Sequence, residues 1–135
     1  MIIQKPPEVD KRAVGCVLLY KDRYLLVHRT KDNLWGSVAG SVHQEETPQQ
    51  AIERELKEEL GLKIKPRVCT TTYHQYNQQK VAYHLFVHKF KEDPKKNIAL
   101  NEEAYTYRWL TLKEAKKLPL FEDEEYCLEL VHKWR

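Results

Sequence analysis

Three glutamates in this 135-residue chain, Glu55, Glu58 and Glu59, have the type and spacing that could do chemistry. At about 100° per residue, helix positions i, i+3 and i+4 lie within about a third of the circumference, so the three carboxylates would share one face. Like charges at this spacing repel one another. Hard divalent cations bind carboxylate and carbonyl oxygens, and Mg²⁺ is usually held by carboxylates, waters and substrate phosphates. The spacing is therefore compatible with a divalent-metal site.

The same residues are also compatible with an ordinary solvated helix face. Six acidic and two basic residues lie between positions 40 and 62. The pairs Arg54–Glu58 and Glu53–Lys57, each four residues apart, would ease the repulsion. From the spacing alone, both interpretations stay open.

The helix that would carry these glutamates is marked at both ends. Thr47 is suited to the N-cap and Pro48 to the first helical position, while Gln50 completes a capping box with Thr47. Gly61 would end the helix. Its apolar residues recur every four positions, as in a helix that lies on a core: Ile52, Leu56 and Leu60.

Segments rich in β-formers lie on both sides of this helix. Strands are expected at residues 12–20, 23–28, 65–73, 80–90 and 105–110, with a hairpin turn at 21–22 and polar breaks at 29–35, 75–79 and 91–103. Further helices are expected from the capping box at 111–114 to about Pro119, and from about Glu122 to the C-terminus. This order predicts an α/β fold, a single-domain α/β/α sandwich with a mixed β-sheet over residues 1–135.

Composition and charge exclude several classes of function. Lys and Arg number 23 against 20 Asp and Glu, a net charge of +3, and the basic residues are dispersed without an aromatic-basic motif. This balance argues against an RNA-binding module or a membrane-surface helix. No apolar run reaches the roughly 20 residues of a bilayer span, and the N-terminal segment lacks the features of a signal peptide. We therefore expect a cytoplasmic protein with no membrane partner.

The stretch from Gly40 to Leu62 resembles the signature of the Nudix hydrolases, written G-x5-E-x7-R-E-U-x-E-E-x-G-U with U an aliphatic residue. All nine specified positions match, namely Gly40, Glu46, Arg54, Glu55, Leu56, Glu58, Glu59, Gly61 and Leu62. The flanking strands and the terminal helix agree with the α/β/α sandwich of that family over nearly the full length.

This resemblance implies a hydrolase that uses Mg²⁺ or Mn²⁺ to cleave nucleoside diphosphates linked to another moiety. It implies metal ligation at four positions: Glu55, Glu58, Glu59 and the backbone carbonyl of Ala39. Glu55 and Glu58 match residues of the family's catalytic centre, and Arg54 with Glu46 matches an ion pair that orients the helix and the loop beginning at Gly40. The implied chemistry is sound, since a cation neutralises a diphosphate that would otherwise repel a nucleophile.

Outside the signature, the family places a further acid, a metal ligand or general base, in a loop before a strand that carries a tryptophan. Glu103, six residues before Trp109, is the preferred candidate, with Glu102 as its neighbour and a solvated side chain as the alternative. Arg29 is placed like a phosphate-contacting arginine of MutT-like members. It could bind a phosphate bidentately or be an ordinary strand-end charge.

Several aromatic residues could stack on a base or simply pack in the core: Trp35, Tyr73, Tyr76 and Phe121. Together with Arg29, Trp35 and Tyr76 are taken as the candidate substrate-binding residues.

The start of the signature loop departs from the common pattern. Many members have Gly-Gly where this chain has Ala39-Gly40, and Gly-Glu where it has Glu45-Glu46. The run from Trp35 resembles the isopentenyl-diphosphate isomerase-like subgroup. Isomerisation is not expected, because true isomerases place a catalytic cysteine where this chain has Val38 and Ala39.

The function expected from these observations is metal-dependent hydrolysis of a small-molecule diphosphate, with a nucleotide as the first choice. The alternatives are an inactive or regulatory nucleotide-binding module and a hydrolase of an isoprenyl-like diphosphate. Capped RNA is the one nucleic acid among the expected substrates, and the protein is expected to be a monomer or a homodimer.

Overall fold

Eight strands and three helices are present in residues 1–134, which the computed structural model describes. The strands are β1 (Ile2–Ile3), β2 (Lys11–Tyr20), β3 (Arg23–Arg29), β4 (Trp35–Gly36), β5 (Val38–Ser41), β6 (Arg67–Tyr76), β7 (Gln79–Phe90) and β8 (Ala104–Leu110). The helices are α1 (Pro48–Leu60), α2 (Leu112–Ala115) and α3 (Glu124–Trp134).

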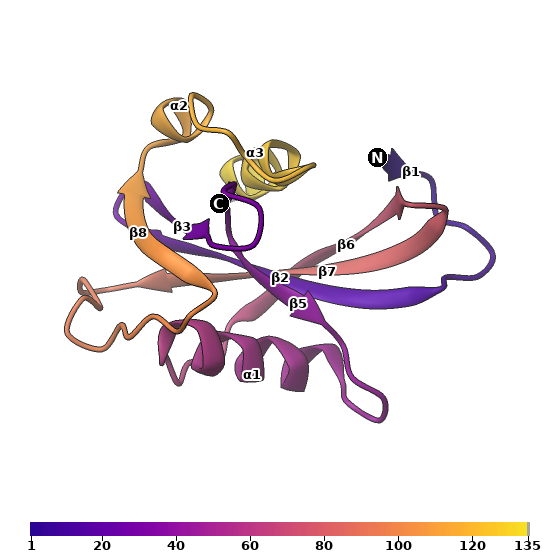
Figure 1. Cartoon of the computed structure of the whole chain (residues 1–135), viewed down its shortest axis with the longest axis horizontal. Helices are drawn as coiled ribbons and strands as arrows, with labels where there is room; N and C mark the ends of the chain where they lie inside the picture. Colours follow the sequence, from indigo (N-terminus) through magenta and orange to yellow (C-terminus); the bar gives the residue numbers. More distant parts are fainter. Residues whose placement is uncertain (135) are drawn as a thin grey trace.

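A mixed sheet forms the middle layer (Figure 1). Its centre is the parallel pair of β2 and β7, in which Lys11 lies opposite Val81. Beyond β7 follow β6 and then β1, both antiparallel to their neighbours. On its other side β2 pairs with β5 along its first half and with β3 near its end, and β3 pairs in turn with β4 and β8. The sheet is therefore mixed, as predicted.

Helix α1 covers one face of the sheet, and α2 and α3 lie over the other (Figure 1). Alternate side chains of β2 point to opposite faces, as the two-residue period of a strand requires. Toward α1 the core contains Val14, Cys16, Leu18, Ile52 and Leu56, among others. Toward α3 it contains Val17, Leu19, Leu128 and Val131, among others. This arrangement confirms the predicted α/β/α sandwich.

Two features of the sheet differ from the sequence prediction. The polar segment 75–79 is not a break between strands, because β6 continues to Tyr76 and β7 begins at Gln79. Asn77 and Gln78 both have positive φ, 48° and 68°, as a tight two-residue hairpin turn requires. Strands β1, β4 and β5 were not predicted, because each is only two to four residues long.

Within residues 1–134, no helix is both long enough and apolar enough to span a bilayer.

Candidate active site

The capping residues of α1 fix the position of its glutamates. The Thr47 hydroxyl accepts the Gln50 N–H at 3.1 Å, and the Gln50 side chain accepts the Thr47 N–H at 2.9 Å. Gly61 ends the helix at φ 70°, and its N–H donates to the Lys57 carbonyl at 2.9 Å. These ends, all predicted from the sequence, set a register in which Glu55 lies on the buried face.

Arg54 joins α1 to the preceding loop through several hydrogen bonds. Its Nε and Nη2 donate to the two carboxylate oxygens of Glu46 at 2.8 and 3.0 Å. Its Nη2 also donates to the carbonyl of Ser41 at 3.0 Å, and its Nη1 to Glu55 Oε1 at 2.8 Å. Hydrogen bonds from Arg54 lower the pKa of Glu46 to about 2. The ion pair expected between Arg54 and Glu46 is thus present, and it holds the loop and helix in one geometry.

Gly40 lies directly against the carboxylate of Glu55. A Cβ at position 40 would lie 2.1 Å from Glu55 Oε1 and 2.3 Å from its Cδ. Glu55 is 9% exposed, so its carboxylate has little room to move aside. A glycine at position 40 is therefore required to seat the Glu55 carboxylate between the loop and the helix.

Glu59 has a carboxylate oxygen with no protein partner. Its Oε2 is buried and accepts no hydrogen bond within residues 1–134. Burial, followed by the hydrogen bond and the negative charge of Glu55, raises the pKa of Glu59, and Glu103 adds to this effect. Arg29 acts in the opposite direction. Glu59 is therefore an acceptor site that favours a proton or another positive partner.

Glu58 lies at the rim of this group. Its side chain is 53% exposed and is 3.4 Å from Arg54 Nη1. Across residues 1–134, no three acidic, histidine or cysteine side chains are gathered into a metal-binding group. The structure thus brings Glu55 and Glu59 together and leaves Glu58 beside them, facing solvent.

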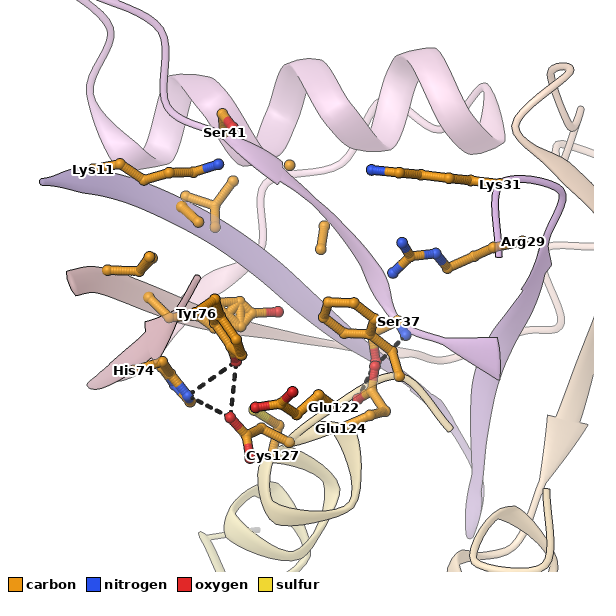
Figure 2. A pocket seen from close by; sticks show the side chains of 18 of the residues that line it. Lys11, Arg29, Lys31, Ser37, Ser41, His74, Tyr76, Glu122, Glu124 and Cys127 are labelled. Carbon is orange, nitrogen blue, oxygen red and sulfur yellow. Dashed lines mark hydrogen bonds and ion pairs between the residues drawn. The ribbon is translucent and has the colours of Figure 1, made fainter. Parts of the chain in front are cut away.

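Glu59 lines a cavity of about 510 Å³. Figure 2 shows this cavity, with Arg29, Lys31 and Tyr76 among the side chains that line it. Arg29 lines it from the end of β3, with its guanidinium 4.3 Å from the ring centre of Phe121 and 2.8 Å from Asp32. Glu103 also lines it, and its carboxylate accepts a hydrogen bond from the Asn101 side chain at 3.1 Å. The volume is within the range of small-molecule sites.

The loop before β8 is attached to the end of β3. The Thr30 N–H donates to the carbonyl of Glu103, and the Thr30 hydroxyl to the carbonyl of Glu102, both at 3.0 Å. Glu103 lines the cavity, whereas Glu102 is not among its lining residues.

The two candidate stacking residues have different surroundings. Tyr76 lines the cavity. Trp35 does not line it, because this residue is only 8% exposed and its ring stacks on His28 at 4.6 Å between ring centres. The apolar ring packs in the core under α3, so it offers no face to a bound base.

Sequence reasoning missed several residues that line the cavity: Lys11, Lys31, His74, Tyr83, Asp123 and Glu124. The alternation of polar and aromatic residues in 72–76, and the acids directly before the final helix, were the available signals. Glu124 is buried and accepts hydrogen bonds from the N–H and hydroxyl of Ser37, the latter at 3.0 Å.

The family model described as NUDIX domain matches residues 9–131. This chain belongs to the Nudix hydrolase family. Its members hydrolyse phosphoric anhydride bonds in nucleoside diphosphate derivatives. The Nudix signature, residues 40–62, therefore corresponds to the loop and helix described above.

Solved structures share this fold at low sequence identity. A dihydroneopterin triphosphate pyrophosphohydrolase of E. coli is 24% identical, with a TM-score of 0.76 over 90% of this chain and 96% of that one. The NUDIX domain of Shewanella oneidensis NrtR, complexed with ADP ribose, is 17% identical, with a TM-score of 0.79 over 96% and 92%. A MutT protein from Methanosarcina mazei Go1 is 17% identical, with a TM-score of 0.75 over 96% and 98%.

Proposed function

We propose that this Nudix protein is a divalent-metal-dependent pyrophosphohydrolase that cleaves the diphosphate bond of a nucleotide, or of a nucleoside diphosphate linked to another moiety. The observation that carries the proposal is Glu59 Oε2, a buried oxygen without a partner in the wall of a cavity that Arg29 also lines. A buried acceptor without a donor costs free energy, which a cation would recover. The relatives with ADP ribose or a pterin triphosphate in their names support a phosphoric anhydride substrate.

The residues present fit a magnesium or manganese ion. They offer hard oxygen donors, and the absent Cβ of Gly40 leaves room for the Glu55 carboxylate. We propose as ligands Glu55, Glu58, Glu59 and the backbone carbonyl of Ala39. When bound, such an ion neutralises phosphate charge and makes a water molecule more acidic.

The remaining groups of the site position the substrate and accept a proton from the attacking water. Arg54 keeps Glu55 oriented through its 2.8 Å contact. Arg29 can exchange its ion pair with Asp32 for a substrate phosphate, which a guanidinium binds bidentately. Glu103, held by Asn101, is the proposed general base that takes a proton from the attacking water.

Two alternatives are less well supported. A regulatory module without activity would have no need for acids at Glu55, Glu58 and Glu59, yet all three are present. An isoprenyl tail would bring an apolar chain against the charged side chains of Lys11, Glu122 and Asp123, which line the cavity.

The test is hydrolysis of a substrate panel with Mg²⁺ or Mn²⁺, together with Mn²⁺ binding measured calorimetrically. The panel contains nucleoside di- and triphosphates, nucleotide sugars, dinucleotides, capped RNA and isoprenyl diphosphates. Glu58→Gln and Glu59→Gln should each lower the turnover of the best substrate by roughly 10²-fold and weaken Mn²⁺ binding, because an amide lacks the charge that a hard cation needs.

Glu53→Gln is the matched control, since this residue is on α1 and, among residues 1–134, its side chain bonds only to Gln49, at 2.9 Å. It should behave as the wild type. Full turnover and unchanged Mn²⁺ binding in both Glu58→Gln and Glu59→Gln would contradict the metal assignment.

A further inference from the structure

The end of β3 and the turn after it contribute two cationic side chains to the wall of the cavity, Arg29 and Lys31 (Figure 2). Backbone hydrogen bonds close this turn on its first residue. The Arg29 N–H donates to the Leu34 carbonyl at 2.8 Å, and the Arg29 carbonyl accepts the Asn33 N–H at 3.0 Å. The turn therefore holds the residues between Arg29 and Leu34 at fixed places beside the cavity.

Asp32, in the middle of this turn, pairs with Arg29. Its Oδ1 accepts the Leu34 N–H at 3.1 Å, and its Oδ2 lies 2.8 Å from Arg29 Nη2. Within residues 1–134 this is the one ion pair of Arg29, and it uses a single guanidinium nitrogen. A phosphate can accept two parallel N–H bonds from a guanidinium. A phosphate can therefore replace a carboxylate that is held through one contact.

Phe121 supports the same guanidinium from the segment before α3. The guanidinium of Arg29 lies 4.3 Å from the centre of the Phe121 ring, and both residues line the cavity. The attraction of a cation to a ring face keeps the guanidinium over the ring without fixing where each nitrogen points. Phe121 is 37% exposed, so its ring does not serve to fill the core. The ring therefore offers a support on which the guanidinium can turn.

We propose that Phe121 and Asp32 are positioning residues that direct Arg29 to the diphosphate of the substrate. Without a ligand, Asp32 holds the guanidinium through Nη2. When the diphosphate enters, the guanidinium stays over the Phe121 ring and turns from Asp32 to two phosphate oxygens. Asp32 therefore competes with the diphosphate and weakens its binding, whereas Phe121 strengthens it. This inference rests on the proposed function, because it requires the diphosphate to bind in the part of the cavity that Arg29 lines.

The test measures the binding of methylenediphosphonate by calorimetry, with and without Mg²⁺. This analogue has a P–C–P bridge that the enzyme cannot hydrolyse, and it carries no base. Phe121→Leu should weaken its binding about fivefold, because the cation loses the ring face, whereas Phe121→Tyr should retain the wild-type affinity. Asp32→Asn should tighten the binding about threefold, because a partly exposed ion pair of about that worth no longer has to be broken.

Two exposed residues provide matched controls. Tyr126 is on α3, is 36% exposed and does not line the cavity, so Tyr126→Leu should bind the analogue as the wild type does. Asp22 is an exposed aspartate in the turn between β2 and β3, outside the cavity wall. Asp22→Asn should therefore also leave the affinity unchanged.

Double variants show whether both positioning residues act through Arg29. Arg29→Met alone should weaken binding about tenfold or more, since it removes a charged bidentate contact. In that background, Phe121→Leu and Asp32→Asn should each change the affinity less than twofold. In Lys31→Met, which removes the neighbouring cation, both should keep their full effects. Full effects of Phe121→Leu and Asp32→Asn in the Arg29→Met background would overturn the positioning role.

Turnover of the best nucleotide substrate gives an independent measurement. Phe121→Leu should raise KM about fivefold and change kcat less, because the ring acts on binding of the diphosphate. If Phe121→Leu raises the KM of a nucleotide but binds methylenediphosphonate as tightly as the wild type, the inference is overturned, because the ring then contacts the base directly.

The analogue also separates this inference from the proposed function. If no nucleotide is hydrolysed but the affinities for methylenediphosphonate change as expected, the proposed function fails and the positioning role stands. If a nucleotide is hydrolysed but Asp32→Asn and Phe121→Leu leave the affinity for the analogue unchanged, the positioning role fails and the proposed function stands. No binding of the analogue to the wild type, with or without Mg²⁺, would also overturn the positioning role.

Discussion

Gly40→Ala tests the packing of the loop against Glu55. The backbone of Gly40 lies outside the left-handed region, so the substitution acts through its Cβ alone. That atom would lie 2.1 Å from Glu55 Oε1, whereas ordinary contacts begin near 3.4 Å, so the carboxylate must shift by more than 1 Å. The shift would break its 2.8 Å contact with Arg54. Overpacking and the lost charged hydrogen bond should together cost about 2–4 kcal/mol.

The measurements are thermal unfolding and turnover. For a domain of this size, the cost corresponds to a drop in Tm of roughly 10 °C. Displacing a proposed metal ligand by about 1 Å should lower turnover roughly 10²-fold. Glu55→Ala provides the internal control: it removes the carboxylate, so adding Gly40→Ala in that background should cost less than 1 kcal/mol. Equal losses of stability in both backgrounds, or a Gly40→Ala protein as stable as the wild type, would refute the packing argument.

Three further predictions concern the surroundings of the site. The Glu46 carboxyl has a folded-state pKa of about 2, below its ordinary 4.5, so its ion pair with Arg54 stabilises the protein fully above pH 4.5. An acid titration of unfolding should show this stability lost as the pH falls toward 2. The loss should be absent in Glu46→Gln. Glu103→Gln should lower kcat with little change in KM, less so at high pH, whereas Glu102→Gln should not; the reverse result would place Glu102 in the site. Chemical denaturation should show Glu124→Ala costing about 2 kcal/mol more than Ser37→Ala, since it alone leaves the buried Ser37 N–H without an acceptor.

The elements that were predicted correctly are those specified by neighbouring residues. The ends of α1 depend on Thr47, Gln50 and Gly61, which are close in sequence and bond to one another or to the same helix. The ion pair between Arg54 and Glu46 spans only the length of one loop and came from the family signature. Such local relations can be recognised without knowing the rest of the fold.

The hydrogen bonds that Asp123 accepts from Tyr76 and shares with His74 could not be predicted in this way. His74 is in β6 and Asp123 precedes α3, so only the packing of α3 over the sheet brings them together. Trp35 was predicted as a substrate-binding residue but is buried in the core. For an aromatic residue near a binding loop, no sequence signal separates a ring in the core from a ring in the cavity. Its stacking on His28 becomes visible only when β3 and β4 pair.

The parallel pairing of β2 with β7 has a consequence for how the chain folds. Lys11 pairs with Val81, and the sequence between these two residues contains β3, β5, the whole of α1 and β6. Contacts this distant in sequence slow folding, because the entropy of closing a long loop is lost before the contacts compensate for it. During synthesis, β2 emerges before β7, and until the two strands pair, apolar residues of β2 such as Val14 and Leu18 remain uncovered on one side. We expect fragments that end before Gln79 to aggregate rather than fold, and the complete chain to fold more slowly than a helical bundle of equal length.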